Sequence, residues 1–175
     1  MKVISNQKWY VLQTRSRFEK KCFDLLLLQG ITVFLPTQKQ KKQWSDRIKE
    51  IESPLFPGYI FVKFEEKDRY SILNTTGIVR FVSFGGEYAS MNDKQIDALA
   101  KIENLEKIVE VIDLELFQGQ NILIASGPFK GIEAKIVRHN GKGKLLLSVE
   151  MIGKGVLLEI GRTKIEHTNQ LSSVN

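Results

Sequence analysis

The residue types that most often perform chemistry in proteins are scarce in this chain. His139 and His167 are the two histidines, and neither has a cysteine or acidic partner at metal-ligand spacing. Cys22 is the single cysteine, so neither an internal disulfide nor a cysteine-rich zinc cluster can form within the chain. We therefore expect no metal, no cofactor and no catalytic residue.

A glycine- and lysine-rich segment, Gly141-Lys142-Gly143-Lys144, superficially resembles a phosphate-binding loop. It lacks the four-residue spacer that precedes G-K-[ST] in a P-loop, so it does not satisfy that motif. Serine, cysteine and histidine show no spacing that supports a nucleophile. Carboxylates are plentiful, which leaves an enzyme acting on nucleic acid as an alternative, but the sequence favours a binding protein that is not an enzyme.

Basic residues are distributed unevenly. Residues 1–86 carry 15 basic and 8 acidic side chains, residues 87–115 carry 3 and 8, and residues 116–175 carry 8 and 4, which together give a net charge of +6. Two basic blocks that flank an acidic one predict two domains with surfaces for a polyanion and a spacer between them. The same excess is also compatible with solubility alone.

Length and composition indicate a soluble globular protein. The 175 residues suit one large or two small domains, and 42% of them are hydrophobic and 26% charged. The longest apolar run, Leu25 to Leu28, is far too short to span a bilayer, and the first residues lack a signal-peptide pattern. We expect a cytoplasmic protein that does not contact a membrane.

The first helix follows an aromatic strand over residues 8–13. Ser16 and Glu19 have the spacing of a capping box. Apolar residues on one helical face follow at Phe18, Cys22, Leu25 and Leu26. Basic residues in the first turn oppose the helix dipole, so a negatively charged partner would explain them, and a solvated face is the alternative.

The remaining pattern up to residue 105 predicts an α+β fold. Strands at 32–36, 59–64 and 79–84 alternate with a polar hairpin or loop at 38–52, a short helix or turn at 65–73, and a helix that Asn92 caps with Gln95. This order is typical of a ferredoxin-like antiparallel sheet with helices on one face.

Glycine turns and a period of two dominate after residue 117. Residues 106–117 are acidic and are expected to be a linker, and residues 118–170 contain five short strands separated by turns such as Asn140-Gly141. This spacing predicts a small β-barrel.

Two motifs that are far apart in the sequence carry a family resemblance. Phe56-Pro57-Gly58-Tyr59 precedes a hydrophobic strand, and Gly127-Pro128-Phe129-Lys130-Gly131 resembles the G-P-F-x-G core of a KOW motif. In this order and at this separation they resemble the NusG family of transcription elongation factors, over nearly the whole chain. The resemblance implies a ferredoxin-like NusG amino-terminal domain at residues 1–105 and a KOW domain with an SH3-like barrel at 118–170.

RNA polymerase is the partner that this resemblance implies. An apolar pocket would bind the clamp helices of the polymerase, and it would comprise Phe56, Tyr59, Phe61, Phe81 and Phe84. A second contact, with the gate loop, would comprise Arg69, Tyr70 and Ser71. The alternative is that these aromatic residues pack only inside the core. Bridging the polymerase cleft would disfavour its opening and suppress pausing or termination.

Other details resemble the specialised RfaH-like and capsule-locus (UpxY-like) paralogues, which act on chosen operons. They are Pro54-Leu55-Phe56-Pro57, the segment from Arg80 to Gly85, and the basic first helix. Such paralogues recognise exposed non-template DNA. By this resemblance the nucleic-acid-binding residues would be Arg15, Arg17, Lys20, Thr75 and Thr76.

The resemblance also implies a protein partner for the barrel, either a small-subunit ribosomal protein or Rho. Its residues would be the KOW motif Gly127, Pro128, Phe129 and Gly131 and a hydrophobic tip at Met151 and Ile152, with burial of the tip as the alternative. An RfaH-type switch of this domain to a helical hairpin is a further alternative, which the glycines and β-branched residues disfavour. We expect a monomer. The alternative function is a ribosome-associated RNA-binding protein, because KOW motifs also occur in ribosomal proteins.

Overall fold

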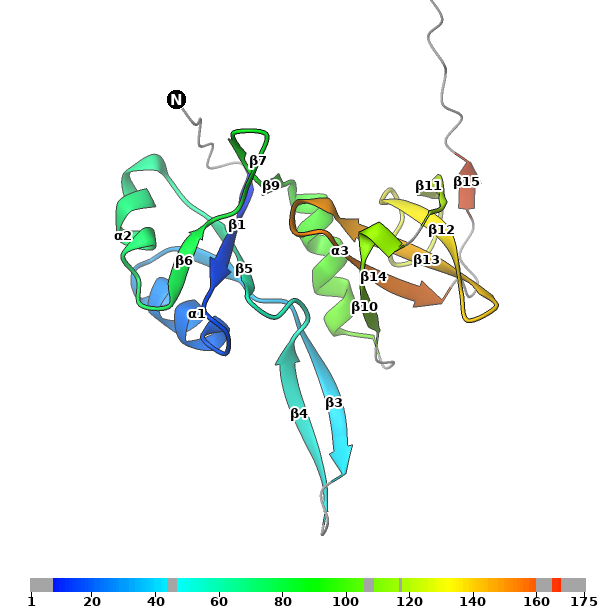
Figure 1. Cartoon of the computed structure of the whole chain (residues 1–175), viewed down its shortest axis with the longest axis horizontal. Helices are drawn as coiled ribbons and strands as arrows, with labels where there is room; N and C mark the ends of the chain where they lie inside the picture. Colours follow the sequence, from blue (N-terminus) through cyan, green and yellow to red (C-terminus); the bar gives the residue numbers. More distant parts are fainter. Residues whose placement is uncertain (1–7, 44–46, 106–108, 117, 160–164, 168–175) are drawn as a thin grey trace, which may run out of the picture. The chain divides into compact units, whose positions relative to one another are not determined.

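A computed structural model describes residues 8–43, 47–105, 109–116, 118–159 and 165–167 (Figure 1). The chain forms two compact units, Met1–Ile108 and Val109–Asn175. Among the described residues, no helix has the length and apolar character needed to cross a membrane.

The first unit is built on an antiparallel sheet around the central strand β1 (Figure 1). The strand order is β2–β5–β1–β6, and a short strand β9 also pairs with β1. The bounds are β1 Trp9–Thr14, β2 Thr32–Phe34, β5 Tyr59–Lys63, β6 Ile78–Phe81 and β9 Ser90–Met91. The register pairs Val11 with Phe61 and Leu12 with Ile60, so alternate side chains of β1 and β5 face the same side.

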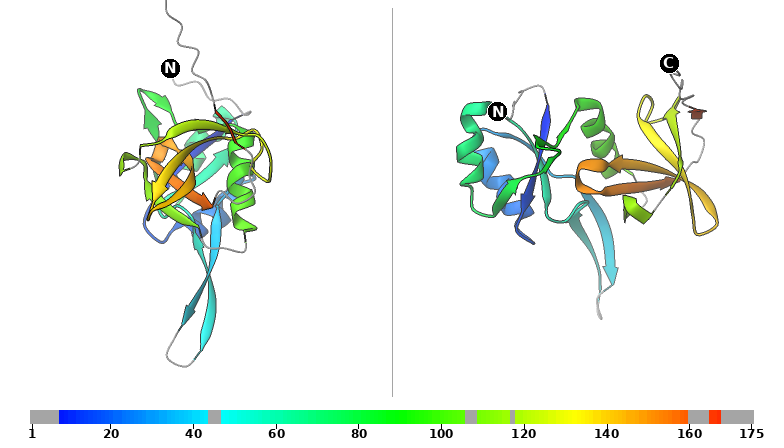
Figure 2. Two further views of the ribbon diagram at one scale, coloured as in Figure 1. Left: turned by 90° about the vertical axis from the view of Figure 1, so that its right-hand side faces the viewer. Right: turned by 45° about the horizontal axis from the view of Figure 1, so that its top comes forward.

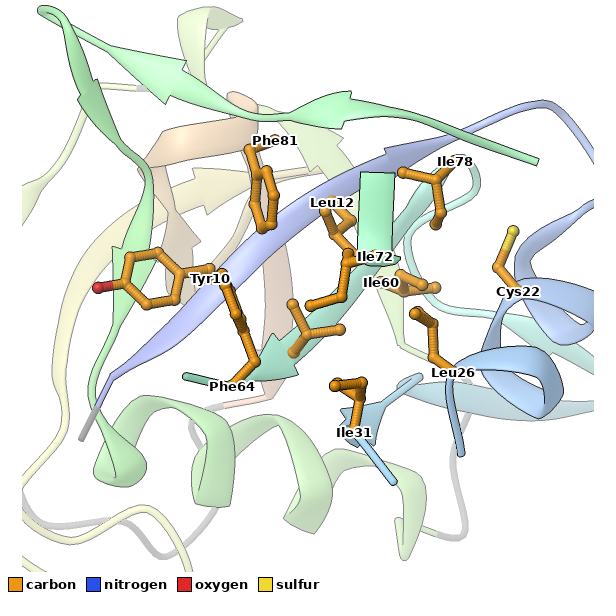
Figure 3. Packing of buried hydrophobic residues seen from close by; sticks show 11 residues of the cluster. Tyr10, Leu12, Cys22, Leu26, Ile31, Ile60, Phe64, Ile72, Ile78 and Phe81 are labelled. Carbon is orange, nitrogen blue, oxygen red and sulfur yellow. The ribbon is translucent and has the colours of Figure 1, made fainter. Parts of the chain in front are cut away.

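Two helices, α1 (Glu19–Leu28) and α2 (Arg69–Leu73), cover one face of this sheet. Figure 3 shows Cys22 and Leu26 of α1 and Ile72 of α2 beside Leu12 and Ile60 of the strands. All five side chains are fully buried. The helical face expected from the sequence is therefore largely correct, with Phe18 partly buried and Leu25 half-buried at its edge.

The third helix, α3 (Asp93–Glu103), is attached to the opposite face, whereas the sequence placed all helices on one face. Asp93 accepts hydrogen bonds from the Trp9 indole at 2.8 Å and from Lys63 Nζ at 3.0 Å. By the alternation of side chains along β1 and β5, both donors lie on the same face of the sheet as Phe61. Apolar periodicity shows that a helix has a buried face but not which side of a sheet receives it. The expected capping box of Asn92 and Gln95 is confirmed.

Two hairpins leave the sheet of the first unit. Strands β3 (Thr37–Gln43) and β4 (Ile48–Pro54) form the expected polar hairpin, which projects away from that sheet (Figures 1 and 2). Its Trp44 lies outside the described residues. Strands β7 (Ser83–Phe84) and β8 (Glu87–Tyr88) form a tighter hairpin through two glycines with positive φ.

The second unit is an SH3-like β-barrel, as expected. Its strand order is β10–β14–β13–β12–β11–β15. The bounds are β10 Glu110–Asp113, β11 Gln120–Ile124, β12 Glu133–His139, β13 Lys142–Val149, β14 Lys154–Glu159 and β15 Ile165–His167. Asn140 and Gly141, with φ of +50° and +74°, make the two-residue turn between β12 and β13. Residues 120–159 thus form strands and not a helical hairpin.

The expected acidic linker is wrong for residues 110–113, which form β10 and pair with β14. The acidic residues of this segment suggested a linker. Two apolar residues at a spacing of two, Ile112 and Leu114, instead pack against a buried cluster of the barrel. The helix before them ends at Glu103. Residues 106–108 and 117 lie outside the described part of the chain.

Burial in the first-unit core predicts an unreactive Cys22 thiol. Desolvation, and secondarily the Glu19 carboxylate, raise the pKa of Cys22 from 9.0 to about 11. Because the pKa rises from 9.0 to about 11, the thiolate fraction at pH 8 is about a hundredfold lower in the native protein than in the unfolded chain. We expect a thiol-specific reagent to modify Cys22 at least that much more slowly in native protein than in urea.

The same shift fixes the sign of a pH effect. Between pH 9 and 11 the unfolded thiol loses its proton while the folded one keeps it, so the free energy of unfolding should fall as pH rises through this window. The variant Cys22→Ala, measured by urea unfolding, should lack this part of the pH dependence. Rapid native modification at pH 8 would contradict the burial.

Candidate functional site

The segment Phe56-Pro57-Gly58-Tyr59 is a tight turn at the start of β5. The Tyr59 N–H donates to the Phe56 carbonyl at 3.1 Å, and Gly58 has φ of +85°, which is the geometry of a type II turn with proline and glycine at its centre. The Gly58 carbonyl accepts the Thr14 N–H at 2.8 Å. The turn is therefore joined to the end of β1.

Glu19, the first residue of α1, holds the same turn from the helix side. Its Oε1 accepts the N–H of Gly58 at 2.7 Å, and the residue is buried. The expected capping box with Ser16 is wrong, because the helix is preceded by Phe18 and has no side-chain cap. The S-x-x-E spacing suggested a local bond between Ser16 and Glu19, but the Glu19 carboxylate accepts from the distant Gly58 N–H instead. A buried carboxylate needs a hydrogen-bond donor, which need not be close in sequence.

The expected pocket of five aromatic residues does not form. Phe56, Phe61 and Phe81 are 1%, 0% and 5% exposed, and so they belong to the core. They also separate: Phe81 packs with Tyr10 and Phe64 under α1 and α2 (Figure 3), whereas Phe56 contacts Phe61 on the other face. The sequence could not distinguish binding aromatics from core aromatics because a strand covered on both faces buries every position.

Two other aromatic residues from the expected set are exposed, and we call Phe84 and Tyr70 the exposed aromatic pair. Phe84 is 82% exposed on β7, and Tyr70 is 75% exposed on α2. The base of the β7–β8 hairpin is fixed, because the Tyr88 ring lies 5.0 Å from that of Phe81. Tyr59 is half-buried.

Arg69 connects the two elements that carry the exposed aromatic pair. Its Nε donates to Glu66 at 2.9 Å, and this bond, followed by one to Tyr88, raises the pKa of Arg69. The guanidinium thus links α2 to the β7–β8 hairpin. Ser71 is exposed, and its hydroxyl donates to the Asp68 carbonyl at 3.1 Å.

Four of the five predicted nucleic-acid contacts are exposed on two adjoining segments, and we call Arg15, Arg17, Lys20 and Thr76 the basic loop surface. The Arg15 N–H donates to the Gly77 carbonyl at 2.8 Å, which joins the loop after α2 to the segment before α1. Gly77 allows this approach, because a Cβ there would lie 2.5 Å from the Phe18 ring.

Thr75 is the exception, and its predicted role as a contact is wrong. The residue is buried, its hydroxyl donates to the Ser71 carbonyl at 3.0 Å, and it accepts from Gln29 Nε2 at 2.9 Å. With these bonds Thr75 holds the loop in place and leaves Thr76 as the exposed member of the pair.

Arg17 has a backbone conformation that is unusual for its type. The Phe18 N–H donates to the Arg15 carbonyl at 3.1 Å, and Arg17 occupies the third position of this turn with φ of +64°. A left-handed conformation costs a non-glycine residue about 1–2 kcal/mol. Arg17 is therefore a locally strained residue that the surrounding turn holds in place.

In the barrel, the G-P-F-K-G segment shapes the loop between β11 and β12. Gly127 and Gly131 have φ of +89° and +79°, Pro128 is exposed and Phe129 is buried. The Gly131 N–H donates to the Ile124 carbonyl at 2.7 Å, which closes the loop.

The proposed hydrophobic tip is only partly available. Ile152 is buried, so its expected role as an exposed contact is wrong, and Met151 is half-buried. Both lie in a short 3-10 turn, Glu150–Ile152, that ends at Gly153 in the left-handed conformation. The turn places the Ile152 side chain in the barrel core, in agreement with the alternative that the tip is buried.

The sequence of the first unit matches a known family. A family model described as "Transcription termination factor nusG" matches residues 7–100, which is more than half of the chain. The chain belongs to the NusG family. This match covers β1 through most of α3, including the Phe56–Tyr59 turn, the basic loop surface and the exposed aromatic pair.

Similar proteins extend the likeness along the chain. The transcription termination/antitermination protein NusG of Lactococcus lactis is 30% identical, over 92% of this chain and 93% of that protein. The protein of the same name from Streptococcus pyogenes is 29% identical, over 87% of this chain and 91% of its own length. A solved structure of Thermotoga maritima NusG has a TM-score of 0.53 at 20% identity and covers 93% of this chain and 97% of that one, which shows a shared fold.

The Glu19 bond predicts a stability effect. Replacing Glu19 with alanine leaves the Gly58 N–H without its acceptor, which should lower the free energy of unfolding by about 1–3 kcal/mol. Urea unfolding measures the change, and the amide resonance of Gly58 should move. Asp24→Ala, at an exposed site on the same helix, serves as the control and should change stability by less than about 0.5 kcal/mol. Equal effects of the two substitutions would contradict the role of Glu19.

The backbone of Arg17 predicts different effects of two substitutions on stability. Arg17→Gly should raise the free energy of unfolding by about 1 kcal/mol because glycine accepts positive φ without steric cost. Arg17→Ala removes the same charge but keeps the strained backbone, so its stability should stay near that of the parent. Thermal or urea unfolding compares them. A more stable alanine variant than glycine variant would show that φ is not positive in solution.

Proposed function

We propose that this chain is a transcription elongation and antitermination factor that binds RNA polymerase through its first unit. The observation that carries the proposal is the family match over residues 7–100, together with relatives named transcription termination/antitermination proteins. The first unit supplies exposed apolar and basic surfaces on the same matched segment.

The polymerase contact is assigned to the exposed aromatic pair instead of the buried aromatic residues. Phe84 is proposed to dock on the clamp helices, and Tyr70, with Arg69 and Ser71, on the gate loop. Exposed aromatic side chains bury large apolar areas on binding and are frequent anchors of protein interfaces. A factor that holds both sides of the polymerase cleft binds its closed state better than its open state, which disfavours pausing.

The nucleic-acid contact is assigned to the basic loop surface. Arg15, Arg17 and Lys20 are exposed cations on one side of a fixed loop junction, and phosphates are the natural partners of such groups. Non-template DNA in the transcription complex is the proposed ligand. Operon-specific action, as in RfaH-like and UpxY-like paralogues, would need base contacts in addition, for which Arg17 and Thr76 are the proposed residues.

For the two units we propose a division of labour. Residues 1–105 would be the polymerase-binding domain, and the barrel, which begins at β10 and not at residue 118, would be a KOW domain. A small-subunit ribosomal protein or Rho would bind the barrel. Of the proposed tip, Met151 is the side chain that remains partly accessible.

A binding experiment with core RNA polymerase tests the proposal. The full chain should bind, and Phe84→Ala should lower affinity about tenfold or more, because burial of one aromatic side chain contributes roughly 1.5–3 kcal/mol. Tyr70→Ala should weaken binding in the same direction. Leu28→Ala is the matched control, since Leu28 is 84% exposed on α1 outside the proposed surface.

Surface-immobilised polymerase gives these affinities directly. Loss of binding with Phe84→Ala but not with Leu28→Ala supports the assignment. Absence of binding by the full chain would overturn the function itself, and unchanged binding by both aromatic variants would overturn the site. Tight, salt-sensitive binding to structured RNA without polymerase would favour the ribosome-associated alternative instead.

A further inference from the structure

Part of the chain between α3 and β11, residues 104–119, belongs to the barrel because residues 110–113 form β10. Only residues 104–109 lie between the end of α3 and the first residue of β10. Six residues span at most about 20 Å when fully extended. If β10 and the turn after it were released, residues 104–119 would lie between α3 and β11 and could span about 55 Å. Pairing of β10 therefore removes about 35 Å of chain from the tether.

Residues 110–114, which we call the strap, are held by two kinds of contact. Ile112 and Leu114 pack on the buried cluster of Val137, Leu146 and Leu157. Gly155 provides the space, since a Cβ there would lie 2.8 Å from a Leu114 methyl group.

Charged groups at both ends of the strap add to this attachment. Asp113 forms an ion pair with Lys154, and Glu110 Oε2 lies 3.0 Å from His139 Nε2. Both partners belong to other barrel strands. The acidic character that resembled a linker in the sequence therefore provides contacts within the barrel, although exposed pairs of this kind contribute only modestly.

The strap is also an edge strand, paired on one side only in the described sheet. β10 ends the strand order and, among the described residues, pairs with β14. A four-residue edge strand can separate without breaking the pairs that join β14 to β13, β13 to β12 and β12 to β11. Elements with few buried contacts open at a lower free energy than the core strands of the same fold.

We propose that the strap can separate from β14, and that this separation lengthens the tether between the two units and so increases the distance that the barrel can reach. While it is paired, six residues connect α3 to the barrel, and so short a tether limits the distance over which the two units can bind their partners at the same time. When it is released, the stored chain lets the barrel reach a partner farther away while the first unit stays bound. The inference concerns tether length and holds whatever partners the two units bind.

The direction of the backbone hydrogen bonds provides a matched pair of variants. The Leu114 N–H donates to the Gly153 carbonyl at 2.9 Å, and the register places Ile112 opposite Gly155. Bonded pairs alternate in an antiparallel ladder, so the Ile112 N–H points at β14 and the Val111 N–H points away. Ile112→Pro should release the strap, whereas Val111→Pro should be tolerated on the free edge.

Energy transfer between two dyes in the full chain measures reach. Asp97→Cys on α3 and Lys142→Cys at the start of β13 are exposed labelling sites, while Cys22 is buried. We expect the parent and Val111→Pro to show the same transfer efficiency, and Ile112→Pro to show lower efficiency with a broader distribution. Amide exchange of β12 and β13 in the same samples reports whether the barrel stays folded.

Each outcome decides the proposal. Lower transfer in Ile112→Pro alone, with β12 and β13 still protected, supports the strap. Unchanged transfer in Ile112→Pro, or an equal loss in Val111→Pro, overturns it. Loss of exchange protection throughout the barrel in Ile112→Pro also overturns it, because the strand would then be inseparable from the fold.

Discussion

The hydrogen bond from the Gly58 backbone to the buried Glu19 carboxylate is the constraint on which the first unit's surfaces depend. It joins the start of α1 to the turn that begins β5 at 2.7 Å. The exposed cations of the basic loop surface lie immediately around this start. A charge buried at a helix N-terminus is favoured by the helix dipole and by the N–H that it accepts, so the junction is fixed electrostatically as well as by packing.

Burial of the central aromatic residues determines what is left for binding. β1 and β5 are covered on both faces, so Phe56 and Phe61 stabilise the fold and cannot act as a docking surface while the unit is folded. Apolar recognition is left to side chains on peripheral elements, among them the β7–β8 hairpin and α2. Arg69 on α2 interacts with Tyr88 on β8, so these two elements lie beside each other.

Much of the architecture was predictable from the sequence, because its signals are local. The Asn92–Gln95 capping box, the Asn140–Gly141 hairpin and the alternating barrel strands each depend on neighbours within a few residues. The barrel's sixth strand was missed because acidic residues at both ends of Glu110–Asp113 hid two apolar positions. Glu19 was misassigned for a related reason, since its partner is 39 residues away.

The candidate site was predicted less well, for a physical reason. Sequence patterns identify aromatic and basic residues but not the side of a layer that each one faces. Phe81 and Phe84 differ by three positions on consecutive strands, and one is buried while the other is exposed. Thr75 and Thr76 are adjacent, and one hydroxyl is used inside the fold. Family membership indicates a general role in transcription, and only the structure distinguishes the exposed from the buried residues of the predicted site.

The central claim is that the first unit binds RNA polymerase through the β7–β8 hairpin and α2. Amide exchange of the full chain with and without core RNA polymerase tests it most directly, because it reports the contacted backbone without any substitution. The account predicts slower exchange over residues 69–73 and 83–88 in the complex. Slower exchange confined to the barrel, or no change in either segment on binding, would contradict it.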